Sequence, residues 1–441
     1  MDQSTLTRRI YSFIWLFVCT SLSVACQDEK APSAPSATSY SADVVTSWLT
    51  MQLKLTQTTP ASPPVLPRRF AYTGIALYEA IVPGLSGYQS IAPQLNGLPS
   101  LPVVTPDAGY YWPACANAAL ATMNRNFYPT TSPANKAAID SLEGANMALY
   151  QKDRPADELN RSADFGRKIA TAVFDWSKTD GNDNNAPYTL PAGAGLWVPT
   201  PPAFAPALLP NWGNCRPLVT GSDAGADQGV PTAYSEDPAS AYYAQVNEVY
   251  TISRNLTAEQ KTIALFWADN PDGKSFVSGH WFSILNQVLA IEKPTLDVAA
   301  VALAQVGIAT ADAGITIFKG KYMHTTVRPI TYIRSVMNQP AWNAFLVTPP
   351  HPEYPSGHAV SSSAAAQTMS LLFGSNYKFT DNSYNLIGFS PRSYNSFEEA
   401  AIEAGNSRLY GGIHYRKSCD VSLVQGKIVA QNVAQKLKFK P

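Results

Sequence analysis

Apolar residues recur at helical spacing along most of this 441-residue chain, and this pattern restricts its fold more than any other feature. Val44, Trp48, Met51 and Leu55, for example, follow one another at three or four residues and would line one face of a helix. Runs of alternating apolar and polar residues, which indicate half-buried strands, are nearly absent. Since 45% of the residues are hydrophobic and 15% charged, the core can be large. We therefore expect an all-α fold, built as one helical bundle or two fused bundles.

Capping signals and composition locate individual helices. Thr257 to Gln260 form a capping-box sequence that should begin a helix running through Trp267, and Lys293-Pro294-Thr295 should begin an alanine-rich helix that ends near Phe318. Residues 180–232 contain nine prolines, which exclude a continuous helix, but their aromatic residues indicate an ordered segment that wraps the surface or shapes the mouth of a site. Further helices are expected over 70–84, 111–126, 134–150, 156–177, 234–252, 276–291, 357–373 and 419–438.

The N-terminus has the composition of an export signal, residues 1–26. Arg8 and Arg9 precede an apolar run that ends at Val18 and is shorter than the roughly 20 residues needed to span a bilayer. The segment 22–26 resembles a bacterial lipoprotein cleavage site with Cys26 as the lipidated residue, although Leu22 lies one position further from Cys26 than usual. Residues 27–42 are rich in Pro, Ser and Ala and predict a flexible tether, which leaves 43–441 as the folded domain. We expect an exported protein, in the periplasm or on the outer membrane or cell surface as a lipoprotein.

The charge balance argues against nucleic acid and anionic membranes as partners, and the spacing of the cysteines argues against a metal site. Lys plus Arg equals Asp plus Glu at 32 each, so no bulk charge attracts nucleic acid or an anionic membrane, and a small-molecule partner is expected. Beyond the signal, Cys115, Cys215 and Cys419 lack the spacing of metal ligands. In an oxidising compartment one pair can form a disulfide. We expect Cys115 with Cys215, which leaves Cys419 as a buried thiol.

Two segments of the C-terminal third are suited to bind an anion, one through its cationic side chains and the other through backbone N–H groups at a helix start. Lys321 and Arg328 are seven residues apart, or two helical turns, and reach the same place if the segment coils until Pro329 ends it. Ser356-Gly357-His358 stands at the start of an expected helix, where unpaired N–H groups and the positive end of the helix dipole attract anions and Gly357 permits close approach.

A third segment completes the set. Arg408 and His414 are six residues apart and would diverge on a regular helix, but Gly411 and Gly412 can break the helix and turn both inward. A lone lysine or arginine is usually a solvated surface group, and a lone PSGH is often just a turn that begins a helix. All three segments together predict an oxyanion site within residues 265–426.

The assembled site suits a tetrahedral oxyanion. Lys321, Arg328 and Arg408 supply three positive charges, the arginines through forked donors and the lysine as a point charge. His358 and His414 add an acid or base and a ligand or nucleophile.

The motifs K-x6-RP, PSGH and SR-x5-H resemble the signature of the superfamily that unites vanadium haloperoxidases with type 2 acid phosphatases. The similarity runs from about Trp267 to Gly426, and residues 266–269 (FWAD) and 279–281 (GHW) are similar to patterns of bacterial vanadium haloperoxidases. Phe318 and Lys319 depart from the Trp and Asp that family members often have before the lysine motif. The helical bundle is the fold that this resemblance implies.

The resemblance also implies residue roles. His414 would be the apical ligand of vanadium, His358 would hydrogen-bond the apical oxygen and act as acid or base on peroxide, and Asp269 would orient Arg408 by a salt link. The remaining vanadate oxygens would be bound by Lys321, Arg328, Ser356, Gly357 and Arg408. His280 and His324 are expected to be structural.

The expected reaction is peroxide-dependent halide oxidation. Vanadate is the implied cofactor, phosphate can occupy the same site, and hydrogen peroxide, halide and a small organic acceptor are the partners. His351 resembles the histidine that algal bromoperoxidases have where chloroperoxidases have Phe. An imidazole there can hydrogen-bond peroxide and titrate in the working pH range, so iodide and bromide should be oxidised to hypohalous acid and chloride poorly.

Two other functions remain open at this stage. An acid phosphatase on the same scaffold would form a phosphohistidine at His414, with His358 protonating the leaving alcohol. The long helical N-terminal half favours the haloperoxidase, because periplasmic phosphatases of this type are about half as long and lipid phosphatases need several membrane spans. A non-catalytic surface lipoprotein with a relic of the site is the third possibility.

Overall fold

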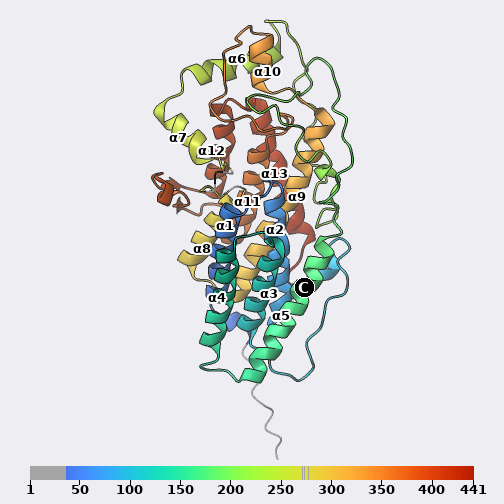
Figure 1. The fold of residues 1–441 in the computed structure, drawn as a ribbon, viewed down its shortest axis with the longest axis vertical. Coiled ribbons are helices and arrows are strands. Elements are labelled where there is room, and N and C mark those ends of the chain that lie inside the picture. Colours follow the sequence, from blue (N-terminus) through green and yellow to red (C-terminus); the bar gives the residue numbers. More distant parts are fainter. Residues whose placement is uncertain (1–35, 271, 273, 277) are drawn as a thin grey trace, which may run out of the picture. The chain divides into compact units, whose positions relative to one another are not determined.

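Helices make up most of the described residues, which bears out the predicted fold class (Figure 1). The structure is a computed structural model that describes residues 36–270, 272, 274–276 and 278–441. The predicted export signal, with Cys26, lies outside these residues, and so does the tether up to residue 35. Packing begins before residue 43, because Ala37 and Ala42 are buried and Ala42 N donates to Pro294 O at 3.1 Å. Residues 37–42 thus belong to the packed domain and not to the tether.

The helices fall into three groups along the chain. The N-terminal group is α1 (Asp43–Thr58), α2 (Val65–Ile81), α3 (Trp112–Phe127), α4 (Pro133–Tyr150) and α5 (Ala156–Ser177). Two helices follow the proline-rich segment, α6 (Ala241–Arg254) and α7 (Ala258–Phe266). The C-terminal group is α8 (His280–Glu292), α9 (Leu296–His324), α10 (Pro329–Ser335), α11 (Gly357–Phe373), α12 (Phe397–Tyr410) and α13 (Arg416–Lys436).

Short elements complete the described fold. The strands β1 (Phe379–Asp381) and β2 (Arg392–Tyr394) form an antiparallel pair in which Phe379 lies opposite Tyr394. The 3-10 turns are η1 (Ala37–Ser39), η2 (Val82–Gly84), η3 (Ala92–Gln94), η4 (Trp212–Asn214) and η5 (Asn385–Ile387).

Helices α2 and α9 join two bundles. α2 packs on α3 and α5, whereas α9 packs on α11 and α13 (Figure 1). The two helices can approach closely because each offers a glycine to the other: a Cβ on Gly74 would lie 2.7 Å from Ala304 Cα, and a Cβ on Gly307 would lie 2.7 Å from Ala71 Cα. Helix α9 is long and apolar enough to cross a membrane, but 83% of its most apolar window is buried in the protein. Its composition is therefore that of a core helix.

One predicted helix start is confirmed, whereas one helix is longer than predicted and another was not predicted. The capping box at Thr257 is present, with Gln260 N donating to Thr257 Oγ1 and Thr257 N donating to Gln260 Oε1. Helix α9 continues six residues beyond Phe318, and Lys321 lies in its last turn. Helix α12 was not expected, although Ser396 caps it by accepting a hydrogen bond from Glu399 N, a spacing visible in the sequence.

The proline-rich segment 180–232 is irregular and ordered, as predicted. Its tryptophans Trp197 and Trp212 are 0% and 4% exposed, and Leu208 lines the main cavity. The segment therefore contributes to the mouth of the site.

The predicted Cys115–Cys215 disulfide is wrong. Cys115, Cys215 and Cys419 are all free, and all three are buried. Cys115 belongs to the large core cluster around α2 and α3, whereas Cys215 packs in a separate cluster with Trp212 and Phe318. The two thiols lie in different cores, which sequence position alone does not reveal.

Candidate oxyanion site

The three sequence motifs meet at one end of the C-terminal bundle. Lys321 comes from the last turn of α9, Arg328 is the N-cap of α10, and Arg408 lies in the last turn of α12. The coil from Lys321 to Arg328 was predicted wrongly, since α9 ends at His324, where Thr325 takes a left-handed conformation with φ of 45°. Arg328 is brought back beside Lys321 by this turn, and Pro329 begins the next helix.

The turn after α12 was predicted correctly. The helix ends at Tyr410, and Gly412 has φ of 74°, a left-handed conformation that glycine adopts without strain. The hydrogen bond from Ile413 N to Arg408 O, at 3.2 Å, folds the chain back so that His414 lies near Arg408 at the cavity.

The three cations are buried and have no carboxylate partner within 4 Å among the described residues. Lys321 and Arg328 are 0% exposed, and Arg408 is 2% exposed. Lys321 Nζ donates to backbone oxygens of Pro352, Glu353 and Pro355. Burial lowers the pKa of Lys321 well below its usual range, with Arg328 adding to the effect, and lowers the pKa of Arg328 and Arg408 to about 10 each. Glu353 and Asp269 offset this buried positive charge only in part, from beyond ion-pair distance, so the site favours a bound anion.

The two arginines are held by backbone oxygens. Arg328 donates from Nε to His351 O at 2.9 Å and from Nη1 to Ile413 O at 2.7 Å. Arg408 donates to Trp267 O and, at 2.9 Å, to Ser407 Oγ. Their forked donors are therefore oriented before any ligand arrives.

His414 presents one ring nitrogen as an acceptor. Its Nδ1 lies 2.8 Å from Glu353 Oε1, and its Nε2 lies 3.2 Å from Nη1 of Arg328. Because arginine only donates, Nε2 must carry the lone pair, and the proton lies on Nδ1 toward Glu353. Burial and the charges of Arg328 and Lys321 lower the pKa of His414 well below 6.5, so the ring is neutral. A neutral imidazole with its lone pair free of a proton is the form that binds a metal.

Glu353 is a site residue that sequence reasoning missed. It is 0% exposed and also accepts hydrogen bonds from Tyr415 N at 3.1 Å and Ser418 Oγ at 2.9 Å. Burial raises the pKa of Glu353, and Arg328 opposes that shift. Its position two residues before the PSGH motif was the only sequence signal, and that signal says nothing of its partner 61 residues away.

The start of α11 faces the same region. Ser356 is the N-cap but forms no capping bond, and its buried Oγ has no hydrogen-bond partner among the described residues. Its backbone N donates to Ser422 Oγ at 2.9 Å, which fixes the helix end. The Cys419 thiol lies near this hydroxyl, which beside a helix N-terminus can also donate to a ligand oxygen. A Cβ on Gly357 would meet its nearest neighbour, Ile317, only at 3.7 Å, so the space beside it is open.

A cavity of about 580 Å³ opens onto most of the predicted site residues. Of the predicted site residues, Arg328 and Ser356 are not among those that line it. Its lining includes Lys321, His351, Gly357, His358, Arg408 and His414. Much of the remaining wall is apolar, with Pro64, Trp281, Phe282, Ile317 and Phe318.

His351 lies in the site, as predicted, and its surroundings oppose protonation of its ring. His351 Nδ1 lies 3.0 Å from Arg328 Nη2 and 3.2 Å from Pro352 O, and the shorter contact, to a group that only donates, favours Nδ1 as the acceptor and Nε2 as the protonated nitrogen. Burial and the charges of Lys321 and Arg328 lower its pKa well below 6.5. These effects favour the neutral ring, with Nε2 as its hydrogen-bond donor.

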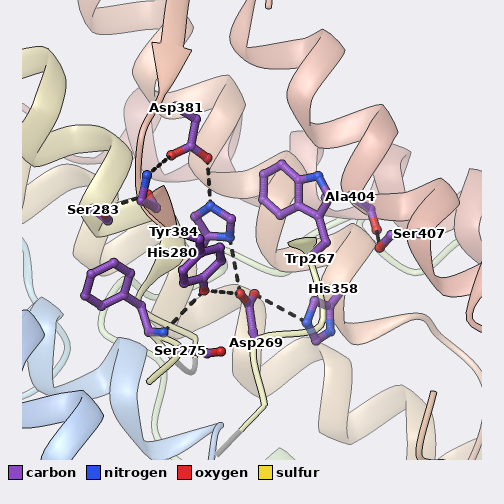
Figure 2. A network of polar contacts seen from close by, with 12 residues as sticks. Trp267, Asp269, Ser275, His280, Ser283, His358, Asp381, Tyr384, Ala404 and Ser407 are labelled. Atoms are coloured by element: carbon purple, nitrogen blue, oxygen red, sulfur yellow. Dashed lines mark hydrogen bonds and ion pairs between the residues drawn. The ribbon is translucent and has the colours of Figure 1, made fainter. Parts of the chain in front are cut away.

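Asp269 has different partners from those expected. No described contact joins it to Arg408. Instead its Oδ2 lies 3.5 Å from Nε2 of His358, and its Oδ1 lies 3.2 Å from Nδ1 of His280 and accepts a hydrogen bond from Tyr384 (Figure 2). His358, from the first turn of α11, is 35% exposed to the cavity. Burial and Arg408 lower the pKa of His358, and contact with Asp269 opposes this shift.

The other two histidines lie outside the cation cage, the group formed by Lys321, Arg328 and Arg408. His280 is 1% exposed at the start of α8, in agreement with a core position, and it also borders the cavity wall. His324 packs edge-on against Tyr354 with ring centroids 5.2 Å apart and does not line the cavity.

Comparisons with known proteins agree with this geometry. Residues 301–440 match the family model of the VCPO second helical-bundle domain. The crystal structure of the first bacterial vanadium-dependent iodoperoxidase is similar over 91% of this chain and 97% of that chain, with a TM-score of 0.83 and 30% sequence identity. The chain belongs to the vanadium-dependent haloperoxidase family. Holo-type and apo-type structures of a bacterial vanadium-dependent chloroperoxidase share the fold at 16% identity. Each covers 86% of this chain, with 94% and 96% of the chloroperoxidase chains covered and TM-scores of 0.64 and 0.63. Comparison with curated protein sequences gives no match.

Membership in this family also accounts for the two bundles. The matched domain model begins within α9 and covers the segments that supply Lys321, Arg328, His358, Arg408 and His414. The N-terminal bundle contributes to the cavity wall of this haloperoxidase-family chain through Pro63, Pro64 and Pro67 at the start of α2.

Proposed function

We propose that the protein oxidises a halide with hydrogen peroxide to hypohalous acid, with vanadate as its cofactor. The observation that carries this proposal is a set of three buried cations, Lys321, Arg328 and Arg408, with no carboxylate within 4 Å among the described residues. They lie beside Nε2 of His414, which carries no proton. Family membership supports it, because an iodoperoxidase 30% identical to the chain is vanadium-dependent.

The donor set fits vanadate. The cations match its negative charge, the orphaned Oγ of Ser356 and the N-terminus of α11 can donate to its oxygens, and His414 Nε2 offers one nitrogen to the metal. We assign binding of the oxygens to Lys321, Arg328, Ser356, Gly357 and Arg408. When bound, vanadate supplies a Lewis acid that activates hydrogen peroxide toward the halide without changing its own oxidation state.

Each remaining residue has a task that this chain's geometry supports. Glu353 holds the proton of His414 on Nδ1 and so keeps Nε2 available. His358 faces Asp269 through Nε2, and no described residue hydrogen-bonds to its Nδ1, so we assign Nδ1 as the atom that accepts a proton from hydrogen peroxide. The balance is one halide, one hydrogen peroxide and one proton giving hypohalous acid and water.

We also propose that the cavity admits a small, apolar organic acceptor. A volume of about 580 Å³ far exceeds what a halide and hydrogen peroxide need and lies in the usual range for organic ligands of roughly 300–1,000 Å³. Trp281, Phe282 and Phe318 supply the apolar wall. The test compares the products of an aromatic acceptor halogenated by the enzyme with those formed by free hypohalous acid. An identical product distribution would mean that the acceptor reacts outside the cavity.

For the halide we propose iodide and bromide over chloride, with a role for His351. The neutral ring offers a hydrogen-bond donor that Phe lacks, at a position that lines the cavity. His351→Phe should shift the ratio of bromide to iodide turnover at matched peroxide. Efficient chloride oxidation by the parent, or an unchanged halide profile in the variant, would refute this role and leave the vanadate site intact.

We propose export with lipidation at Cys26, on the basis of Arg8, Arg9 and the following apolar run. Mass spectrometry of the mature chain from cells tests this. A lipid-modified N-terminal Cys26 supports the anchor, and an unprocessed N-terminus contradicts it.

The function itself is tested in one preparation loaded with vanadate or with phosphate. Peroxide-dependent iodide oxidation should require vanadate and vanish with phosphate. Hydrolysis of phosphate monoesters should remain minor, whereas hydrolysis without any halide oxidation would favour the acid phosphatase.

A further inference from the structure

Behind His358 lies a buried histidine held between two carboxylates. His280 Nδ1 lies 3.2 Å from Asp269 Oδ1, and His280 Nε2 lies 2.7 Å from Asp381 Oδ2 (Figure 2). The side chains of His280, Asp269 and Asp381 are 1%, 8% and 0% exposed. Asp381 comes from β1, more than 100 residues after Asp269, so the fold builds this arrangement from distant segments.

Both ring nitrogens of His280 face a carboxylate oxygen. A neutral imidazole has one N–H and one lone pair, so only the imidazolium donates to both carboxylates. Three aromatic rings also surround it, with centroids 4.4 Å (Trp267), 4.7 Å (Tyr384) and 5.3 Å (Phe266) from its own. Aromatic faces favour a cation. Burial opposes the charge, but Asp381 and Asp269 outweigh it and raise the pKa of His280 to about 10.

Asp269 links this cation to the cavity. Burial by itself would favour the neutral acid, but His280 and His358 keep the pKa of Asp269 far below its usual range. Tyr384 donates to Asp269 Oδ1 at 2.6 Å, and Tyr384 in turn accepts a hydrogen bond from Phe276 N at 3.2 Å. The remaining oxygen, Oδ2, faces Nε2 of His358. Oδ1 of Asp269 is therefore held by His280 and Tyr384, while Oδ2 faces His358.

We propose that His280 is a positioning residue, which, held by Asp381, keeps Asp269 ionised and aimed at Nε2 of His358. This inference rests on the proposed function and deepens it. An ionised Asp269 holds the proton of neutral His358 on Nε2, so Nδ1 keeps the lone pair that accepts the peroxide proton. The charged groups around His280 and His358 are Asp269, Asp381 and Arg408, with the phenol of Tyr384.

The direct test needs no vanadate and no turnover. The chain has five histidines, so ¹⁵N NMR of histidine-labelled, vanadate-free protein can resolve every ring. At pH 7.5 we expect His280 to be doubly protonated and His358 to be neutral with its proton on Nε2, with signals assigned from single His→Gln variants. A neutral His280, or a His358 proton on Nδ1, overturns the proposal.

Variants add a kinetic test. In His280→Gln and Asp381→Asn, the proportion of His358 carrying its proton on Nδ1 should rise. The kcat of iodide oxidation should fall on the order of 10- to 100-fold, while the Kd for vanadate changes little. Asp312→Asn is the matched control, because Asp312 is an equally buried carboxylate that binds Leu218 N and Val219 N and does not line the cavity.

The control should keep the His358 tautomer and kcat even if it loses stability. Equal losses of kcat in Asp312→Asn and Asp381→Asn would assign the effect to general destabilisation and overturn the positioning role. If the parent oxidises no halide, the proposed function fails, but the NMR result still decides whether His280 holds Asp269 and His358 as inferred.

Discussion

Replacing Glu353 by Gln should weaken vanadate binding specifically through His414. Glu353 accepts hydrogen bonds from His414 Nδ1, Tyr415 N and Ser418 Oγ, and Gln keeps a single acceptor oxygen for these donors. A hydrogen bond to a charged group contributes roughly 1.5–3 kcal/mol, against about 0.5–1.5 kcal/mol for a neutral one. The loss of about 1–2 kcal/mol at His414 corresponds to a 5- to 30-fold weaker vanadate complex, at about 1.4 kcal/mol per tenfold.

An opposing effect has to be separated from this loss. Glu353→Gln also removes a negative charge near Lys321 and Arg328, which makes the cage more positive and favours any oxyanion. Inorganic phosphate is attracted by the same charge, but we expect it to bind without a covalent bond to His414. The ratio of the vanadate Kd to the phosphate Kd therefore isolates the contribution of the histidine.

Isothermal titration of the apoprotein with each anion gives this ratio. We expect it to rise at least fivefold in Glu353→Gln and to stay within about twofold in Ser418→Ala, which removes one hydrogen bond of Glu353 and keeps its charge and its contact with His414. A ratio that does not change in Glu353→Gln would refute the reasoning, since His414 would then bind vanadate without help from Glu353.

Four further predictions concern the cofactor and the fold. His414→Ala should abolish peroxide-dependent halide oxidation and greatly weaken vanadate binding in titration, because His414 supplies the only nitrogen assigned to the metal; full vanadate affinity in this variant would contradict that assignment. Inorganic phosphate should compete with vanadate for the apoprotein, and zinc or magnesium should not restore activity, so a preparation activated by a divalent metal alone would rule out vanadate as the cofactor. The pKa of folded His280 is raised to about 10, so the contribution of its charged ring to the free energy of unfolding is complete below about pH 6.5 and is lost as the pH rises to 10. Between these pH values, the free energy of unfolding measured with denaturant should fall in the parent, and His280→Gln should lack this fall. Gly307→Ala should lower the free energy of unfolding by about 1–3 kcal/mol because its Cβ would strike the α2 backbone, whereas Gly144→Ala, with open space around its Cβ, should not.

The parts of the fold that follow from local rules could be predicted from sequence. Helical periodicity and the capping box at Thr257 are properties of neighbouring residues, and both correspond to real helices. The glycine turn at Gly411 and Gly412 is equally local, and it brings His414 back to Arg408 as expected.

What sequence reasoning missed depends on contacts between distant segments. Glu353 meets His414 across 61 residues, and Asp381 meets His280 across 101, with no periodic signal to mark either pair. Asp269 was assigned to Arg408, but the fold instead brings His280 and Tyr384 to the same carboxylate. The lowered pKa of His351 has a related origin, because burial and the charges of Lys321 and Arg328 act on the ring only after folding.

The central claim is that the cation cage holds vanadate with His414 as its ligand. A crystal structure of the vanadate-loaded protein tests this most directly. We predict a bond from vanadium to Nε2 of His414, with Lys321, Arg328 and Arg408 within hydrogen-bond distance of the other vanadate oxygens. Vanadate bound elsewhere in the cavity, or bound in the cage without a bond to His414, would contradict the account.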